Sequence, residues 1–341
     1  MEKEIHVLVT IKLSKEQRAR LDDIAEEIQL NIISAKAPED IPDEIWEETE
    51  VLYTDGILPD PEKTPNLKWI QFQFAGIDPF FSHPLMQKRD LIATTMSGAI
   101  TSQVAEYVMM TILVFGQKLP LLSHYQREQM WPDHEEKHQS LMPVDLRHST
   151  VGILGYGSIG RQVARLLQPF GATILATKHD VMHPEDTGYI PEGMGDPHGD
   201  LFDRLYPIEA LHSLLAESDF VVVALPLTNA TFHLLDENAF EAMKQSAYLI
   251  NVARGAVVDQ AALVGALQSK KIAGAALDVF EEEPLPTDSP LWEMDNVILS
   301  PHIAGLSRSL EAETLTLFIE NLNRFLADLQ LLNQIDLTKE Y

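Results

Sequence analysis

The sequence predicts an α/β protein of two doubly wound domains, each a parallel sheet with helices on both faces. Short apolar runs alternate with amphipathic stretches over the first hundred residues, and a second such alternation begins near residue 150. Alternation of this kind is typical of parallel sheets, because each helix carries the chain back to the edge where the previous strand began. With 341 residues, the chain is long enough for two separate cores.

The first alternation contains five predicted strands and an amphipathic helix. Apolar side chains share one face of a helix expected over residues 15–28, namely those of Leu21, Ile24, Ala25 and Ile28. Prolines punctuate the connections between these elements. The predicted strands occupy residues 5–11, 32–35, 51–54, 67–74 and 91–95.

The second alternation contains six predicted strands joined by crossovers, the pattern of a complete dinucleotide-binding domain. An apolar helix over residues 102–118 leads into it, and residues 120–148 are expected to form a connecting loop or arm. Residues 182–207 are rich in Gly, Pro, His and acids and are long for a connection. The last forty residues are helical and are expected to pack on the first domain. The six strands are expected at residues 150–154, 172–177, 220–225, 247–253, 273–280 and 296–300.

Composition excludes several classes of partner and site. The chain carries 25 Lys and Arg against 52 Asp and Glu, and its charge of −27 repels nucleic-acid phosphates and anionic lipids. It contains no cysteine, so disulfides, thiolate metal sites and a cysteine nucleophile are excluded, and no metal site is expected. The acidic first residues do not resemble a signal peptide, and the longest apolar run is too short to span a bilayer. We therefore expect a soluble, cytoplasmic protein with no nucleic-acid or membrane partner.

Residues 151–160 form a GxGxxG motif between a predicted strand and a predicted helix. Gly155 permits a tight turn, Gly157 lets the backbone approach a pyrophosphate, and Gly160 lets the helix pack closely on the strand. The N–H groups of Ser158 and Ile159, at the positive end of the helix, are expected to hold the pyrophosphate. Because strand, glycines, helix and next strand follow in this order, the motif indicates a dinucleotide site.

The strand after this motif ends where an acidic residue would bind the ribose 2′-hydroxyl of NAD. Lys178 stands there instead, 18 residues after Gly160. A cation at this point attracts a 2′-phosphate, with Thr177 and His179 beside it. The sequence therefore favours NADP over NAD. The alternative is that Lys178 is merely solvated and NAD binds through other contacts.

Three polar residues follow predicted strands at the carboxyl edge of the second sheet, where ligands of such folds bind. They are Arg254, Glu283 and His302. An imidazole titrates near neutral pH, so it suits proton transfer to the keto oxygen of a 2-keto acid as C2 accepts a hydride. A carboxylate against the far ring nitrogen orients the imidazole, and an arginine fork holds a substrate carboxylate.

These motifs closely resemble those of the D-isomer-specific 2-hydroxyacid dehydrogenases, from about residue 67 to residue 310. The resemblance implies D-specific hydride transfer between NAD(P)H and a small 2-keto or 2-hydroxy acid, such as glyoxylate or hydroxypyruvate. It also implies a Rossmann domain, residues 102–302, inserted in a flavodoxin-like substrate domain, residues 1–101 and 303–341. The matching segments are residues 155–160, 225–228, 251–259, 277–284 and 301–305.

The resemblance also assigns roles to single residues. Arg254 would bind the carboxylate and carbonyl of the substrate, Glu283 would be the partner of His302, and His302 would be the general acid and base. Asp278 would bind the nicotinamide carboxamide, with the backbone of Ala253 nearby. The other implied positions are Pro226 and Thr231 in the cofactor groove, and the backbone N–H groups of Ala75, Gly76 and Ile77 at the substrate carboxylate.

Some residues depart from the family pattern or suggest assembly. Phe74 stands where many members carry a small residue, which would narrow the pocket or favour an apolar substrate tail. Glu281 and Glu282 match no catalytic role and are interpreted as a solvated acidic turn. The helix of residues 102–118 and the arm containing Arg127 and Trp131 resemble the dimer-forming region, so the resemblance implies a homodimer.

Three alternatives stay open. Co-repressors of the same family bind NAD(H) as scaffolds without turnover, although the charge of −27 counts against that role here. Formate and phosphite dehydrogenases share the fold, but residues 73–78 of the substrate loop contain no Lys or Arg for a small oxyanion. Residues 182–207 are expected to lie near the adenosine end of the cofactor. Three roles stay open for them, which are to cover the 2′-phosphate, to contact a partner subunit, or to have no role.

Overall fold

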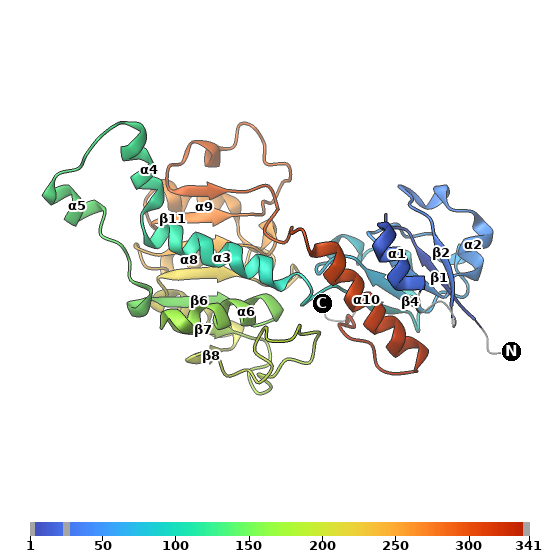
Figure 1. The fold of residues 1–341 in the computed structure, drawn as a ribbon. Coiled ribbons are helices and arrows are strands. Elements are labelled where there is room, and N and C mark those ends of the chain that lie inside the picture. The colour runs from blue at the N-terminus through green and yellow to red at the C-terminus, as the bar shows by residue number, and fades with distance from the viewer. Residues whose placement is uncertain (1–3, 23–27, 337–341) are drawn as a thin grey trace. The chain divides into compact units, whose positions relative to one another are not determined.

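The computed structural model describes residues 4–22 and 28–336 and divides into two compact units. Unit 1 comprises Met1–Ile100 and Ser307–Tyr341, and unit 2 comprises Thr101–Leu306 (Figure 1). The sequence predicts borders after residues 101 and 302. Each unit is a parallel sheet with helices packed on it, so the prediction of two α/β domains is confirmed.

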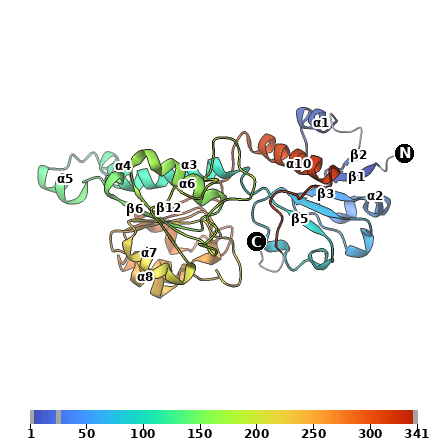
Figure 2. The ribbon, with the colours of Figure 1, turned by 90° about the horizontal axis from the view of Figure 1, so that it is seen from below.

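The described residues of unit 1 form a five-stranded parallel sheet and three α-helices. The elements are β1 (Ile5–Val9), α1 (Lys15–Asp22), β2 (Ile28–Ile32), α2 (Asp43–Glu48), β3 (Val51–Thr54), β4 (Trp69–Phe72), β5 (Ile92–Thr94) and α10 (Leu310–Leu326). The strand order is β2-β1-β3-β4-β5, which is the flavodoxin-like order. Helix α10 packs on the sheet through Phe318, whose ring stacks on that of Tyr53 at a centroid distance of 4.3 Å. Helices α1 and α10 lie on the same face of the unit 1 sheet (Figure 2).

The predicted helix over residues 15–28 is wrong at its end. Residue Ile28 begins β2 and pairs with Ile5 in the parallel ladder, and the predicted strand over residues 32–35 lies earlier, at Ile28–Ile32. Ile28 satisfies both the helical and the strand period, so the pattern did not separate the two elements. The predicted helix positions Ile24 and Ala25 lie outside the described residues.

Unit 2 contains a seven-stranded parallel sheet in the order β12-β11-β10-β9-β6-β7-β8. Counted from its own first strand, this is the doubly wound order of dinucleotide-binding domains with one strand added at the edge. The strands are β6 (Thr150–Leu154), β7 (Thr173–Thr177), β8 (Arg204–Tyr206), β9 (Phe220–Val223), β10 (Tyr248–Asn251), β11 (Gly274–Leu277) and β12 (Val297–Leu299). The helices are α3 (Thr101–Gly116), α4 (Leu119–Arg127), α5 (His134–Ser140), α6 (Ser158–Leu167), α7 (Leu211–Glu217), α8 (Glu237–Ala242) and α9 (Gln260–Gln268).

The strand β8 is absent from the six that the sequence predicts. It has three residues at the edge of the sheet, and its first residue, Arg204, is exposed. A short polar edge strand leaves no apolar run to detect. It lies within residues 182–207, so the connection from β7 is shorter than the sequence suggests.

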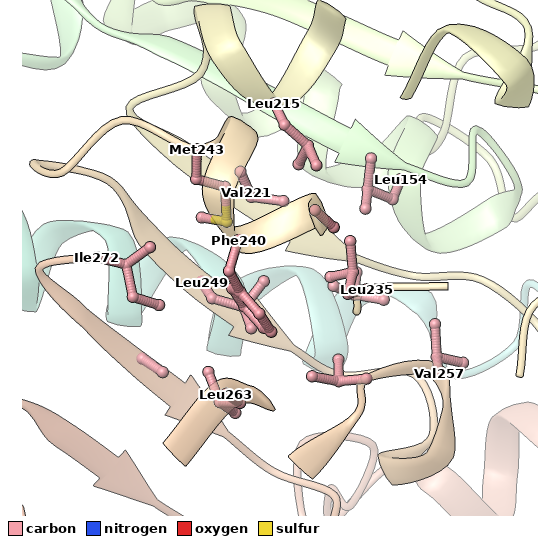
Figure 3. Packing of buried hydrophobic residues seen from close by; sticks show 14 of the residues in the cluster. Leu154, Leu215, Val221, Leu235, Phe240, Met243, Leu249, Val257, Leu263 and Ile272 are labelled. Carbon is pink, nitrogen blue, oxygen red and sulfur yellow. The ribbon is translucent and has the colours of Figure 1, made fainter. Parts of the chain in front are cut away.

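The central strands of unit 2 are apolar because both faces of the sheet are covered. Strand β9, Phe-Val-Val-Val, is fully buried along its length. One face packs against α7, α8 and α9, where Leu215, Phe240 and Leu263 meet Val221 and Leu249 of the sheet (Figure 3). The other face packs against α3 and α6 (Figure 2). This double packing fixes the strands, so the loops that leave their carboxyl ends have a rigid base.

Among the described residues, no single helix is long and apolar enough to cross a membrane. The bent pair of α3 and α4 reaches the required length and apolar composition only when the two are taken together. More than half of α3 is buried in unit 2.

Candidate active site

Most of the predicted site residues lie on loops that leave the carboxyl ends of neighbouring strands in unit 2. Arg254 follows β10, Asp278 and Glu283 follow β11, and His302 follows β12. These three strands are adjacent in the sheet and pair in parallel, so their carboxyl ends share one edge. The sequence-predicted arginine, carboxylate and histidine are therefore at the same edge of one domain.

The phosphate loop between β6 and α6 has the geometry that the glycine motif predicts. Gly155 has φ +100°, and a Cβ there would lie 2.5 Å from the carbonyl oxygen of Ala224. A Cβ on Gly160 would lie 2.2 Å from the carbonyl oxygen of Gly155, so helix and loop could not pack as closely. A Cβ on Gly157 would meet nothing within 4 Å. The loop thus leaves open space at the glycine that is expected to face a pyrophosphate, and Ser158 and Ile159 begin α6 directly after it.

Three of the predicted cofactor contacts lie at the end of β7. Thr177 is fully buried, and its hydroxyl accepts a hydrogen bond of 3.0 Å from the backbone N–H of Gly155. The structure thus gives this hydroxyl a role in holding the phosphate loop, and the predicted contact of Thr177 with a 2′-phosphate stays a prediction. The side chain of Lys178 is half-buried, and that of His179 is exposed. Burial lowers the pKa of the Lys178 ammonium, and the nearby Arg161 lowers this pKa further.

The loop after β9 contains the predicted groove residues Pro226 and Thr231. The hydroxyl of Thr231 donates to the carbonyl oxygen of Pro226 at 2.6 Å and accepts from the N–H of Thr228 at 2.8 Å. These bonds close a compact turn next to the phosphate loop, since β9 and β6 are paired. The structure therefore gives Thr231 a role in shaping this loop.

The loop after β10 fixes the backbone around Arg254. Asn251 accepts a hydrogen bond from the N–H of Ala253 at 3.1 Å and donates to the carbonyl oxygen of Arg254 at 3.2 Å. The Arg254 guanidinium donates through Nη1 to the carbonyl oxygen of Ala253 at 2.9 Å. One side of the guanidinium is thus held by the backbone of its own loop, which limits the rotamers of a side chain that is flexible on an open surface.

The imidazole of His302 is paired with the carboxylate of Glu283. The distance from Nδ1 of His302 to Oε2 of Glu283 is 2.8 Å, and Oε1 of Glu283 accepts from the backbone N–H of Phe280 at 3.0 Å. The second bond fixes the carboxylate, and the carboxylate in turn fixes the ring. About half of the His302 side chain is exposed, so its Nε2 is the ring nitrogen available to a ligand.

The backbone at His302 is held in a left-handed conformation by Asp278. The φ of His302 is +55°, which is uncommon for a residue other than glycine. The carboxylate of Asp278 is buried and accepts from the N–H groups of Ile303 and Ala304 at 2.9 and 2.8 Å, and the N–H of His302 donates to the Asp278 carbonyl oxygen at 2.8 Å. Asp278 therefore determines the shape of the histidine loop. Its predicted contact with a nicotinamide carboxamide stays a prediction.

Two residues at this edge, Ser300 and Glu281, make contacts that were not predicted. Ser300 donates to Asp278 and lies 2.7 Å from the hydroxyl of Tyr107 on α3. Glu281, which the sequence suggests is a solvated turn residue, accepts from the N–H of Gln260 at 2.8 Å and lies 3.0 Å from Nε2 of His233. Glu281 thus joins the loops after β9, β10 and β11. These contacts have no signal in the sequence, because each joins residues that are far apart along the chain.

The predicted substrate loop lies in unit 1, directly after β4. Ala75 and Gly76 are partly exposed, Ile77 is buried, and Phe74 is exposed. Within the described part of the chain, the backbone N–H groups of residues 75–77 donate no hydrogen bond. Unpaired N–H groups in a row are suited to an anionic ligand.

No group of three or more His, Asp or Glu side chains within residues 4–22 and 28–336 is arranged to hold a metal ion.

Comparison with known proteins decides the family. Residues 109–304 match the model of the D-isomer specific 2-hydroxyacid dehydrogenase NAD binding domain, which is more than half of the chain. The chain belongs to the D-isomer-specific 2-hydroxyacid dehydrogenases. As a member of this family it is an oxidoreductase that transfers a hydride between a nicotinamide cofactor and a 2-hydroxy or 2-keto acid.

Relatives and solved structures agree with this 2-hydroxyacid dehydrogenase family. A glyoxylate reductase of Thermofilum pendens is 38% identical over 251 residues, which cover 74% of this chain and 69% of the relative. A D-isomer specific 2-hydroxyacid dehydrogenase of Xanthobacter autotrophicus, solved with NADPH and MES, is 28% identical with a TM-score of 0.81 over 99% of this chain and 100% of that chain. A probable 2-hydroxyacid dehydrogenase of Rhizobium etli, solved with NADP, HEPES and L(+)-tartaric acid, is 26% identical with a TM-score of 0.78 over 99% of this chain and 100% of that chain.

Proposed function

We propose that the protein reduces a small 2-keto acid to the D-2-hydroxy acid and that His302 is the general acid. The observation that carries the proposal is the pairing of His302 Nδ1 with Glu283, which leaves Nε2 available on an exposed ring. When bound, NAD(P)H supplies the hydride that C2 of the keto acid accepts. The keto oxygen gains its proton from Nε2 of His302, and the negative charge of Glu283 stabilises the imidazolium that donates it. In the reverse direction Nε2 accepts the hydroxyl proton.

Arg254 completes the proposed set by binding the substrate. Its guanidinium is anchored through Nη1 at the carbonyl oxygen of Ala253, and the planar fork of a guanidinium matches a carboxylate and an adjacent carbonyl oxygen. This contact orients the 2-keto acid and polarises the carbonyl that accepts the hydride. In unit 1 taken by itself, the backbone N–H groups of residues 75–77 donate no hydrogen bond to described residues, and we propose this row as an anion-binding site of that unit.

For the cofactor we propose a preference for NADP(H) over NAD(H). The open space at Gly157 and the start of α6 suit the pyrophosphate of either cofactor. The end of β7 carries the cation Lys178 at the position where an acidic residue would accept the 2′-hydroxyl of NAD. The Xanthobacter and Rhizobium structures, with NADPH and NADP respectively, support this preference.

The test is the oxidation of NADPH and NADH, followed by absorbance, against a panel of 2-keto acids that includes glyoxylate and hydroxypyruvate. We expect turnover with at least one acid and faster turnover with NADPH. Formate and phosphite with the oxidised cofactors serve as a second panel, because these substrates belong to dehydrogenases of the same fold. If both cofactors bind and neither panel gives turnover, the protein is a cofactor-binding scaffold and the proposal is wrong.

We also propose that the protein is a homodimer formed through the arm of α4 and α5. The arm extends from the rest of unit 2 (Figure 1). Trp131, in the arm, is 89% exposed. Further exposed apolar residues on or beside the arm are Met110, Leu119, Leu122, Met130 and Met142. Large apolar side chains exposed within one segment of the chain are typical of a protein interface.

Sedimentation velocity tests the dimer. We expect the protein to sediment as a dimer and Trp131→Asp to shift it towards the monomer, because a charge in an apolar interface loses its solvation without a partner. Trp292→Asp is the matched control, since Trp292 is also exposed and lies outside the arm. A monomer at micromolar concentration, or equal effects of the two variants, would refute the arm as the interface.

A cytoplasmic location and the lack of a nucleic-acid or membrane partner remain predictions. The charge of −27 supports them through repulsion of phosphates and anionic lipids. Fractionation of cells that express the protein, with a pull-down on immobilised DNA and anionic vesicles, tests both.

A further inference from the structure

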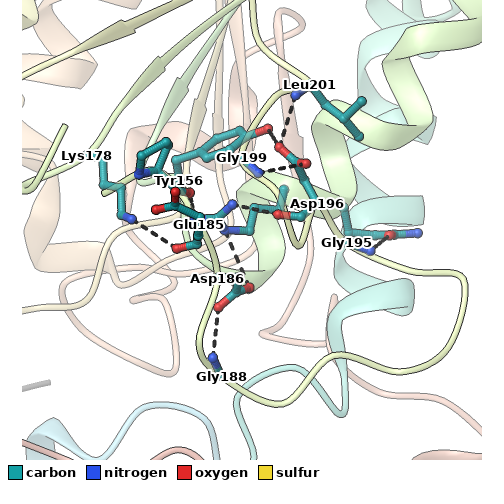
Figure 4. A network of polar contacts seen from close by, with 12 residues as sticks. Tyr156, Lys178, Glu185, Asp186, Gly188, Gly195, Asp196, Gly199 and Leu201 are labelled. Carbon is teal, nitrogen blue, oxygen red and sulfur yellow. Dashed lines mark hydrogen bonds and ion pairs between the residues drawn. The ribbon is translucent and has the colours of Figure 1, made fainter. Parts of the chain in front are cut away.

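The connection between β7 and β8, residues 179–203, has almost no regular secondary structure, yet it is held by buried polar contacts (Figure 4). We name it the β7–β8 segment. A connection of this length without helices or strands is uncommon in a compact domain and is usually either disordered or functional. The contacts of the β7–β8 segment are those of an ordered element. One of them joins the segment to the phosphate loop.

The first attachment of the segment is the buried carboxylate of Asp196. Its Oδ2 accepts from the hydroxyl of Tyr156 at 2.7 Å and from the N–H of Leu201 at 3.0 Å, while its Oδ1 accepts from the N–H of Gly199 at 3.0 Å. Tyr156 is the residue between the first two glycines of the phosphate loop and is itself buried. Burial and the Asp196 carboxylate raise the pKa of the Tyr156 phenol, so the phenol remains a donor. The segment is thereby joined to the pyrophosphate-binding loop.

The second attachment is Arg161 of α6, whose side chain is 1% exposed. Its guanidinium donates to the carbonyl oxygens of Asp196, at 2.7 Å, and of Pro184, and its Nε lies 3.4 Å from the carboxylate of Asp186. A buried guanidinium is costly unless its donors are paired. All of these partners belong to the β7–β8 segment, so the segment must stay folded to keep Arg161 satisfied.

The segment also binds the side chain of Lys178. The ammonium donates to the carbonyl oxygens of His183 and Glu185, while the carbonyl between them, that of Pro184, accepts from Arg161. Two cations thus hold three successive carbonyl groups. A lysine on an open strand end samples many rotamers and loses that freedom when it binds an anion. Here the segment fixes the ammonium at the end of β7 beforehand.

The acidic residues of the segment are largely engaged with other groups. Asp180 pairs with His183 at 2.7 Å, Asp186 with Arg161, and Asp196 with Tyr156. Asp203 accepts from the backbone N–H of Ile174 at 2.7 Å. The ammonium itself bonds neutral carbonyl groups and keeps its net charge for a ligand.

We propose that the β7–β8 segment is a cofactor-specificity element that positions Lys178 for the 2′-phosphate of NADP(H). This deepens the cofactor preference proposed above and rests on it. The segment selects the phosphorylated cofactor by preorganising a cation, since less conformational entropy is lost when the phosphate binds. Its joint attachment to Tyr156 and Arg161 couples that cation to the pyrophosphate loop.

The contact between Gly199 and Pro184 allows a test that leaves Lys178 in place. Gly199 has φ +68°, and a Cβ there would lie 2.3 Å from the carbonyl oxygen of Pro184, so Gly199→Ala displaces the turn that holds Lys178. Gly193 in the same segment has φ +76° and nothing within 4 Å of a Cβ. Gly193→Ala is therefore a matched control with the same backbone strain and no collision.

The dissociation constants of NADPH and NADH are measured by titration calorimetry without any 2-keto acid. We expect Gly199→Ala to weaken NADPH binding about tenfold and NADH binding less than about twofold, because part of a charge-assisted contact is lost. Gly193→Ala should change neither by more than about twofold. In a Lys178→Ala background, Gly199→Ala should have no further effect on NADPH, which a merely structural role would not produce.

Several results would overturn the proposal. The first is that the wild-type protein binds NADH as tightly as NADPH. The second is that Gly199→Ala weakens the binding of both cofactors equally. The third is that the effects of Gly199→Ala and Lys178→Ala on NADPH binding add up. If Gly199→Ala does not fold, Tyr156→Phe removes one attachment and should shift the NADPH to NADH ratio in the same direction. Because the titrations contain no keto acid, a failure to find a substrate would leave them unaffected.

Discussion

Replacement of His302 by alanine is expected to lower kcat by about 10²- to 10⁴-fold, the usual contribution of a positioned general acid. The dissociation constant of the reduced cofactor should change by less than about twofold. The reason is geometric, since Nδ1 of His302 is occupied by Glu283 and only Nε2 is available to a substrate. Water must then protonate the keto oxygen without a fixed orientation. Steady-state kinetics with saturating keto acid and a separate cofactor titration measure the two quantities.

His233→Ala is the matched control for this variant. His233 also has a positive φ, +49°, and also pairs with a carboxylate, that of Glu281, at 3.0 Å. His233 differs from His302 in its role, because its contact with Glu281 joins two loops and the proposed mechanism assigns it no proton transfer. We expect its loss in kcat to be at least about tenfold smaller than that of His302→Ala. Equal losses, or turnover retained by His302→Ala, would show that another group moves the proton.

The sequence predicts that Arg254, Glu283 and His302 lie at one edge of the sheet, and the structure places them there for a topological reason. In a parallel sheet every strand ends at the same edge, so residues that follow successive strands come together even when they are far apart in sequence. Arg254, Glu283 and His302 each follow a strand whose apolar run is recognisable. The glycine motif is also predictable from the sequence. A tight turn, the close approach of the backbone to a pyrophosphate, and the close packing of the helix on the strand each require a glycine, and the spacing of the three is fixed.

The parts that the sequence did not predict depend on tertiary contacts. Thr177 looks like a ligand-facing residue from its position, but its hydroxyl is turned to the backbone of Gly155. The β7–β8 segment and the edge strand β8 have no periodicity, since the segment is held by buried polar groups rather than by an apolar stripe. Glu281 is exposed, as interpreted, but its contacts were not predicted because its partners are 21 and more residues away in the chain. Such contacts exist only once the sheet has brought the loops together.

Arg254→Lys is expected to lower kcat/KM by about 10²-fold or more, even though the positive charge is kept. The reason is geometric, because a guanidinium held at Ala253 presents a fork to a carboxylate and a carbonyl, whereas an ammonium is a point charge. Two charge-assisted hydrogen bonds of about 1.5–3 kcal/mol each are replaced by one that is less well aligned. The loss should appear in both kcat and KM, since the guanidinium binds the ground state and polarises the carbonyl as charge develops on its oxygen.

Arg204→Lys is the matched control, because Arg204 is an exposed arginine paired with Glu217 and lies on the edge strand β8, away from β10. Exposed pairs of this kind contribute little, so its kinetics should stay within about twofold of the wild type. Wild-type kcat/KM in Arg254→Lys would mean that charge alone suffices. That result would overturn the guanidinium fork as the group that orients the substrate carboxylate.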